Sequence, residues 1–235
     1  MRVAVIPAAG AGRRFGGKKQ FFKILGRPVI EFPLEIFNKS ELIDAIILVL
    51  PEEDIDTGKA LQKKFPKIAA VVKGGKERQF SVFRGLLKAS ELNPEEVIVH
   101  DGVRPMVELS TINDLTVALS DYNADGVILG VKPKDTVKEV GAPLEPGDFL
   151  VKRTVNRDKL ILVQTPQIFK FDTLLECHTK AEKEGIIATD DSALLERFGY
   201  TVVSISGDYR NIKITTPEDV KIVETFLKDL YPQGE

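Results

Sequence analysis

The chain has 235 residues, of which 43% are hydrophobic, so it can bury a full core and is not expected to be disordered. Its formal net charge of −2 excludes a generally basic surface, so we expect no nucleic-acid partner. Cys177 is the single cysteine, which excludes an internal disulfide and a cysteine metal cage. No apolar run approaches the ~20 residues that span a bilayer, and no signal peptide precedes the first apolar strand. We therefore expect a soluble, cytoplasmic protein with no membrane partner.

Strand and helix patterns alternate along almost the whole chain. Apolar runs predict strands at residues 3–6, 45–50, 69–72, 97–99, 127–131, 161–165 and 202–205. Helical periodicity predicts helices at residues 28–38, 53–64, 77–90, 111–122, 171–184 and 191–198. The motif Thr216-Pro217-Glu218-Asp219 predicts the start of a final helix that runs to about Leu230. Because strands that are apolar on both faces are typical of parallel sheets covered by helices, we predict an α/β fold with a mainly parallel sheet and helices on both faces.

Residues 132–157 interrupt this alternation with three prolines and two glycines. Extended pieces at 135–140 and 149–155, joined by 141–148, predict a β-hairpin arm that projects from the sheet. A solvated loop is the alternative. Because an isolated two-stranded arm is marginal in water, we expect it to pack against a second subunit. We thus predict a single domain over residues 1–235, with 132–157 as a dimerisation arm.

A loop rich in glycine and cations follows the first strand. Glycines let backbone N–H groups turn toward an anion, cations neutralise it, and open α/β sheets bind ligands beyond the carboxyl ends of their strands. The loop therefore predicts a site for a nucleoside triphosphate, with a flexible solvated loop as the alternative. Gly16 comes one residue late for a Rossmann fingerprint, and Lys19 stands where a P-loop needs Ser or Thr. The loop reads Ala8-Ala9-Gly10-Ala11-Gly12-Arg13-Arg14-Phe15-Gly16-Gly17-Lys18-Lys19-Gln20.

Two charged side chains follow the strand at 97–99. Asp101 lies where it can reach a Mg²⁺ on the triphosphate, since Mg²⁺ prefers one or two carboxylates plus phosphate oxygens. Arg104 offers a fork suited to a phosphate on a second substrate. The alternative is a salt bridge between Asp101 and Arg104 that only holds the turn. Elsewhere, Gly75 with Ser81 is a candidate for base or ribose, and Lys213 for phosphate.

Together these motifs resemble the 2-C-methyl-D-erythritol 4-phosphate cytidylyltransferases. The resemblance spans nearly the whole chain, and its motifs are specific as a set although each alone is weak. They are Pro7-Ala8-Ala9-Gly10-x-Gly12-Arg13-Arg14, Lys19-Gln20, Gly74-Gly75-x-x-Arg78-Gln79-x-Ser81-Val82, His100-Asp101-Gly102-x-Arg104-Pro105, Thr154-Val155-Asn156-Arg157, Gln164-Thr165-Pro166-Gln167, Thr189-Asp190-Asp191 and Asn211-Ile212-Lys213-Ile214-Thr215. The resemblance implies a homodimer with a Rossmann-like nucleotidyltransferase fold. It also implies that the protein joins CTP to a polyol phosphate with Mg²⁺ and releases pyrophosphate, in non-mevalonate isoprenoid biosynthesis.

The resemblance also assigns roles to individual residues. Arg14 and Lys19 would stabilise charge on the α-phosphate, and the backbone of residues 10–17 would hold the β- and γ-phosphates. Asp101 would lie near the metal. Lys213 and Arg157 would position the substrate phosphate together with Arg104, Thr136 and Thr165, and the arm would carry Thr136 and Arg157 into the partner's site. The nucleotide would meet Ala8, Ala9, Gly10, Gly12, Gly75, Ser81 and Gly102.

Some features depart from the family pattern and leave alternatives open. Arg210 occupies a place where family members often carry an acid, so a second metal carboxylate is in doubt and Asp208 is the remaining candidate. A ribitol 5-phosphate cytidylyltransferase shares the loop and the Asp101 motif, although Asp135-Thr136 and Thr154-Val155-Asn156-Arg157 favour methylerythritol phosphate. A non-catalytic nucleotide-binding module is a further alternative, and the presence of Arg14 and Lys19 argues against it.

Overall fold

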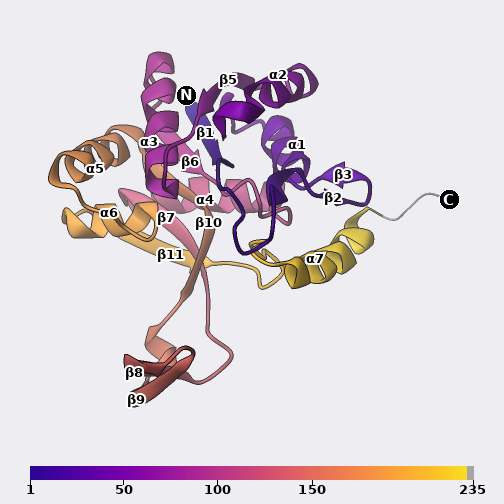
Figure 1. The fold of residues 1–235 in the computed structure, drawn as a ribbon. Coiled ribbons are helices and arrows are strands. Elements are labelled where there is room, and N and C mark those ends of the chain that lie inside the picture. The colour runs from indigo at the N-terminus through magenta and orange to yellow at the C-terminus, as the bar shows by residue number, and fades with distance from the viewer. Residues whose placement is uncertain (232–235) are drawn as a thin grey trace.

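The computed structural model describes residues 1–231, and a seven-stranded sheet forms their centre (Figure 1). The strands, in their spatial order, are β11 (Val202–Ser206), β7 (Gly126–Val131), β10 (Leu162–Lys170), β6 (Glu96–Val99), β1 (Arg2–Pro7), β4 (Ala45–Leu50) and β5 (Ile68–Lys73). All neighbouring pairs are parallel except those that β10 makes with β6 and β7. The predicted α/β fold with a mainly parallel sheet is confirmed.

Strand β10 differs from its predicted length. The sequence predicts a strand over residues 161–165, whereas the observed strand runs from Leu162 to Lys170. The register with β7 shifts between Gln164 and Gln167, which is the signature of a bulge. A bulge accommodates a proline because its residues need not donate to the ladder. Thr165 lies within this irregular stretch, and its hydroxyl contacts His100 and Asp101 just after β6, in the site described below.

Helices cover both faces of the sheet, and each strand contributes alternate side chains to the two layers. In β1, Ala4 and Ile6 pack in one buried cluster with α1 (Glu31–Lys39), α2 (Ile55–Lys64) and α4 (Leu109–Asp121). Val3 and Val5 pack in the other cluster, with α3 (Arg78–Ala89), α5 (Phe171–Glu184) and α6 (Asp191–Arg197). Short 3₁₀ turns lie at Lys19–Phe21, Glu52–Asp54, Ser90–Leu92 and Arg157–Lys159. No helix of residues 1–231 is both long enough and apolar enough to cross a bilayer.

A third buried cluster joins α7 (Pro217–Leu230) to a small hairpin of β2 (Lys23–Ile24) and β3 (Arg27–Pro28). The predicted start of the last helix is confirmed, since the backbone N–H of Thr216 donates to Asp219 Oδ2 at 2.8 Å. Helix α1 begins at Glu31 rather than at Pro28, because Pro28 belongs to the hairpin. The last four residues of the predicted domain, 232–235, lie outside the described residues.

The arm is a two-stranded ribbon of β8 (Val137–Glu145) and β9 (Asp148–Val155) that projects from the body between β7 and β10 (Figure 1). The strands are longer than predicted, and the expected connection over 141–148 shrinks to a tight turn at Pro146 and Gly147. Gly141 and Pro143 suggest a loop by composition, but a ribbon without a third strand tolerates them because it makes ladder bonds on one side only. The register shifts around Val140 and Pro143 record this irregularity.

Candidate active site

A cavity of about 580 Å³ opens at the carboxyl ends of β1, β5 and β6. This is the edge where an open parallel sheet binds ligands. The structure brings ten of the predicted site residues together in its lining: Ala8, Ala9, Gly10, Gly12, Arg14, Lys19, Gly75, Ser81, Asp101 and Lys213. These residues come from four separate stretches of the chain, so the sheet and not their sequence spacing assembles the site.

The loop after β1 folds around Gly12. The carbonyl oxygen of Gly12 accepts the backbone N–H groups of Phe15 at 2.9 Å and Gly16 at 3.0 Å. Gly12 has φ +64°, and a Cβ on it would lie 1.8 Å from the carbonyl oxygen of Gly17, so only glycine fits. Among the described residues, the backbone N–H groups of residues 9–14 have no acceptor. The amides open to an anion thus form a shorter stretch than the 10–17 that the resemblance implies.

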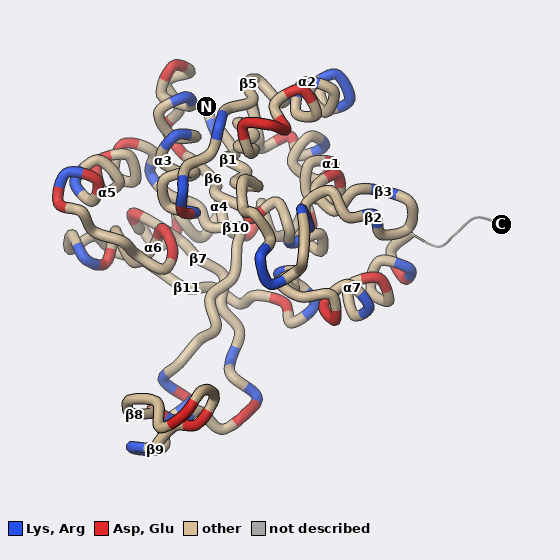
Figure 2. Tube along the Cα trace, viewed as in Figure 1, with Lys and Arg blue, Asp and Glu red and all other residues tan. Residues whose placement is uncertain are grey.

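Lys18 and Lys19 leave the loop in different directions. The ammonium of Lys18 lies 2.7 Å from the carboxylate of Asp54, which anchors the end of the loop to the connection between β4 and α2. The ammonium of Lys19 donates to the carbonyl oxygen of Ile214 at 2.7 Å and lines the cavity. Burial lowers the pKa of Lys19, and the nearby cations Lys213 and Arg14 lower it further. Figure 2 shows the Lys and Arg positions of this loop beside the end of the sheet.

The turn between β5 and α3 forms the opposite wall of the cavity. A Cβ on Gly74 would lie 2.2 Å from the Cβ of Ala9, so glycine is what lets this turn approach the first strand. The Ser81 hydroxyl accepts the backbone N–H of Gly75 at 3.1 Å and donates to the carbonyl oxygen of Glu77 at 3.2 Å. In this arrangement Ser81 fixes the turn, and one lone pair of its oxygen remains for a ligand.

Three cations surround the carboxylate of Asp101, whose side chain is only 6% exposed. Arg78 Nε lies 2.7 Å from Oδ1, Lys213 Nζ lies 2.8 Å from Oδ2, and Arg104 Nε lies 3.7 Å from Oδ2. Burial alone would raise the pKa of Asp101, but these cations hold it well below its ordinary value. The group is therefore ionised at neutral pH. From the sequence, a salt bridge between Asp101 and Arg104 is the alternative to their binding roles. That contact exists, but at 3.7 Å it is the longest of the three.

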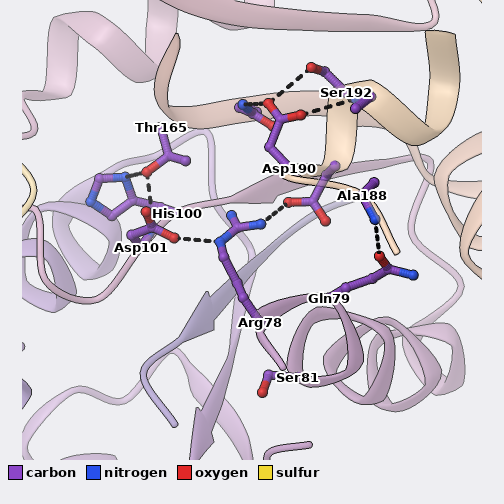
Figure 3. Close-up of polar contacts among 12 residues, drawn as sticks. Arg78, Gln79, Ser81, His100, Asp101, Thr165, Ala188, Asp190 and Ser192 are labelled. Atoms are coloured by element: carbon purple, nitrogen blue, oxygen red, sulfur yellow. Dashed lines mark hydrogen bonds and ion pairs between the residues drawn. The ribbon is translucent and has the colours of Figure 1, made fainter. Parts of the chain in front are cut away.

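Arg78 is the member of this cluster to which sequence analysis gave no role. It is the first residue of α3, and its guanidinium lies between Asp101 and Asp191, with Nη1 2.7 Å from Asp191 Oδ2. Figure 3 shows the guanidinium of Arg78 directed away from α3 toward Asp101. The only sequence feature that could have drawn attention to Arg78 is its place at the start of a helix, just after the glycine pair Gly74-Gly75. Its carboxylate partners lie 23 and 113 residues away along the chain, so spacing alone does not reveal them.

A second cavity of about 410 Å³ adjoins the first and shares Arg78, Asp101 and Lys213 with it. Arg104 and Thr165, both predicted to bind the second substrate, line this cavity. Its far side is formed by polar residues at the start of α6 and on β10: Gln164, Gln167, Thr189, Asp190, Ser192 and Glu196. The shared wall therefore lies between the two cavities, and its cations Arg78 and Lys213 line both of them.

The hydroxyl of Thr165 is already used within the protein. Burial lowers the pKa of His100 to about 4, so this imidazole is neutral at pH 7. Its Nε2 lies 3.1 Å from the carbonyl oxygen of Arg104 and must donate to it, which leaves Nδ1 to accept from Thr165 at 3.2 Å. Thr165 in turn accepts the backbone N–H of Asp101 at 3.0 Å (Figure 3). Thr165 and His100 thus hold the Asp101 turn in place.

Three of the predicted residues lie outside these two cavities. Gly102 is buried, and a Cβ on it would lie 3.0 Å from the Cβ of Ala8, so it serves close packing under the nucleotide loop. Thr136 is exposed on the way into the arm. Arg157 follows the arm, where its guanidinium donates to the carbonyl oxygen of Lys134 and lines a small recess with Lys132. Thr136 and Arg157 thus lie at the two ends of the arm, and their role in a partner's site stays a prediction.

The donor set around Asp101 suits a metal that arrives with phosphates. Mg²⁺ in such sites takes one or two carboxylates and completes its shell with phosphate oxygens and water. Asp101 supplies one carboxylate at the cavity wall, and no three acidic, histidine or cysteine side chains of residues 1–231 converge as a closed metal site. Asp208, the candidate for a second carboxylate, pairs with Arg210 at 2.8 Å instead.

Comparisons with known proteins agree on one family. A family model described as 2-C-methyl-D-erythritol 4-phosphate cytidylyltransferase matches residues 2–229. A protein of that name from Clostridium acetobutylicum is 41% identical over 97% of this chain and 98% of its own length, and one from Geotalea uraniireducens is 40% identical over 98% of each. The crystal structure of 4-diphosphocytidyl-2C-methyl-D-erythritol synthase from Anaerococcus prevotii is similar with a TM-score of 0.83, at 35% identity over 97% of this chain and 96% of that one.

Proposed function

Because the chain belongs to the 2-C-methyl-D-erythritol 4-phosphate cytidylyltransferase family, we propose that it joins CTP to 2-C-methyl-D-erythritol 4-phosphate. The products are 4-diphosphocytidyl-2-C-methyl-D-erythritol and pyrophosphate, and the reaction belongs to non-mevalonate isoprenoid biosynthesis. One observation supports the proposal beyond the family name: Arg78, Asp101 and Lys213 form a charged wall that two adjoining cavities share. Two substrates that react with each other need two adjoining spaces of this kind.

The reaction asks mainly for positioning and charge stabilisation. The attacking phosphate monoester is ionised at neutral pH, so it needs no strong general base. The obstacle is to bring two polyanions together in line while negative charge develops on the equatorial oxygens of the α-phosphate. Cations that protein contacts already hold in place meet this need without reorganising during the reaction.

Each cavity supplies one side of this task. In the first, the free amides of residues 9–14 would bind the β- and γ-phosphates, and Arg14 and Lys19 would face the α-phosphate. In the second, Arg104 and Lys213 would hold the phosphate of the polyol. The hydrogen bond from Lys19 to Ile214 places its ammonium beside the segment that carries Lys213, which supports their joint action on the reacting phosphates.

We include Mg²⁺ in this proposal as a cofactor brought by the nucleotide, with Asp101 as its carboxylate partner. Bound there, the ion would neutralise phosphate charge and orient the triphosphate. The contacts that Arg78 and Lys213 make with Asp101 keep that carboxylate ionised, which is the state that a metal partner needs.

We further propose a homodimer in which the arm crosses to the partner. The arm leaves large apolar side chains exposed to solvent, among them Leu144 at 68% and Leu150 at 65%. A second copy of the chain would cover them, and Thr136 and Arg157 would then lie at the partner's second cavity. A cytoplasmic location and the expected absence of nucleic-acid and membrane partners stay predictions.

The test is pyrophosphate release from CTP and Mg²⁺ with each polyol phosphate in turn. We expect release with 2-C-methyl-D-erythritol 4-phosphate and none above background with ribitol 5-phosphate. The relatives reported above carry the methylerythritol name, so the ribitol phosphate alternative is not favoured. Release with ribitol 5-phosphate alone would reverse that choice. CTP binding without release from either acceptor would point to the non-catalytic module.

A further inference from the structure

The contacts of Arg78 form a bridge that reaches from the active site to the helices behind it. Its guanidinium contacts Asp101 through Nε and Asp191 through Nη1, each at 2.7 Å. Asp191 in turn contacts His178 Nε2 at 3.0 Å through its other oxygen. We propose that Arg78 is a positioning residue, which Asp191 holds in place so that the Asp101 carboxylate keeps the orientation that presents Lys213 to both cavities.

The orientation of Asp101 depends on how its two oxygens are shared. Oδ1 faces Arg78, whereas Oδ2 faces Lys213 at 2.8 Å and Arg104 at 3.7 Å. If Arg78 were lost, Oδ1 would be a buried carboxylate oxygen without a partner. Arg104 is the next cation within reach, so the carboxylate would turn toward it and draw away from Lys213. Both phosphate-binding cations of the second cavity would then move.

Asp191 and His178 fix the far end of the bridge. The side chains of Asp191, at the start of α6, and of His178, within α5, are 1% and 0% exposed. The imidazole of His178 also stacks on Phe83 of α3, with ring centroids 5.9 Å apart. The bridge therefore ties the wall of the active site to three helices on one face of the sheet, and its position does not depend on Arg78 alone.

A guanidinium is the group that this position requires. Arg78 uses two different nitrogens in a planar fork to reach carboxylates on opposite sides, whereas a lysine ammonium is a single point of charge. Lysine at 78 would keep one ion pair and lose the other. Glutamine or methionine would keep neither. Activity should therefore fall in the order arginine, lysine, and then glutamine or methionine at position 78. A positive charge alone should not restore full activity.

This inference rests on the proposed cytidylyl transfer, so its first test is kinetic and its second is not. We expect Arg78→Met to lower kcat about 10- to 100-fold with little change in the KM for CTP, since misplacing reacting groups costs rate more than nucleotide binding. Arg78→Lys should recover only part of this loss. Asp191→Asn should lower kcat as well, and the double variant should be about as slow as Arg78→Met alone.

The matched control is Lys88→Met, which removes an exposed ion pair with Glu91 from the same helix. We expect it to leave kcat unchanged. Thermal unfolding of every variant separates slower catalysis from loss of folded protein. Full activity of folded Arg78→Lys, or strictly additive effects of the Arg78 and Asp191 changes, would overturn the proposal.

The second test needs no turnover. In a crystal structure of Arg78→Met, we expect the Asp101 carboxylate to have turned from Lys213 toward Arg104. An Asp101 that keeps its contact with Lys213 would overturn the inference, whatever reaction the protein performs. If the wild-type protein released no pyrophosphate while the carboxylate turned as expected, the proposed function would fail and the positioning role of Arg78 would stand.

Discussion

The ammonium of Lys213 lies 2.8 Å from the carboxylate of Asp101, although 112 residues separate them in the chain. Asp101 follows β6, and Lys213 lies in the segment between β11 and α7. Their contact closes the wall between the nucleotide cavity and the second cavity. The pair therefore defines where two bound substrates would meet, and the predictions below concern the residues on either side of it.

The loop cations should matter most for rate. We expect Arg14→Ala and Lys19→Ala each to cost at least about 2.7 kcal/mol of barrier, roughly a hundredfold in kcat, because in the proposed reaction each would remove a charge that faces the α-phosphate. Steady-state pyrophosphate release measures this. Lys23→Ala, an exposed cation outside both cavities, is the control and should stay near the wild-type rate. A loss below tenfold for both variants would remove these residues from the proposed roles.

The shape of the loop should depend on Gly12 but not on Gly17. Alanine at 12 would meet the carbonyl oxygen of Gly17 and hold a left-handed backbone, at a cost of about 1–2 kcal/mol from the backbone alone. We expect its affinity for CTP to fall about tenfold or more. Gly17→Ala meets no atom within 4 Å and should bind CTP nearly as the wild type does. Titration calorimetry compares the two, and equal affinities would show that the observed loop conformation is not the one that binds.

The carboxylate of Asp191 should make stability depend on pH. Burial alone would raise the pKa of Asp191, but Arg78 and His178 lower it to about 2, against 3.8 for an ordinary aspartate. Because the folded value lies below the unfolded one, the stabilisation is complete above about pH 4 and is lost as the pH falls through 2. The shift corresponds to about 2 kcal/mol in total, and to about 1 kcal/mol between pH 5 and pH 3.

Urea unfolding of the wild type and Asp191→Asn at several pH values measures this effect. The difference in unfolding free energy between the two proteins should narrow by that amount between pH 5 and pH 3. A difference for Asp191→Asn that does not change with pH would mean that the bridge to Arg78 does not hold in solution.

Arm exchange should allow two inactive variants to restore each other. In a mixed dimer of Arg157→Ala and Lys213→Ala, one site would receive intact Arg157 from the partner and keep its own Lys213. With random exchange of subunits, about a quarter of the wild-type activity should return. Mixing Lys19→Ala with Lys213→Ala is the control, since both residues line the same cavity of one subunit and no intact site can form. Failure of the first mixture, with exchange verified, would place Arg157 outside the partner's site.

The sequence by itself determined the architecture and the kinds of side chain at the site, because both depend on residues that are close together in the chain. Alternating apolar runs and helical periodicity predict the order of strands and helices, and the glycines and cations after β1 indicate a loop that can bind phosphates. The carboxyl ends of parallel strands meet at one edge, which is why Asp101 and the first loop could be expected side by side.

Only the tertiary structure decided which charges face each other. The partners of Arg78 are 23 and 113 residues away, and an ion pair across such distances depends on how α3, α6 and β6 pack. The irregular pairing around Thr165 and the contact of Lys18 with Asp54 also depend on elements that lie far apart in the chain. The local sequence determines which contacts a side chain is able to make. The residue that it actually contacts depends on the packing of helices and strands that are far apart in the chain.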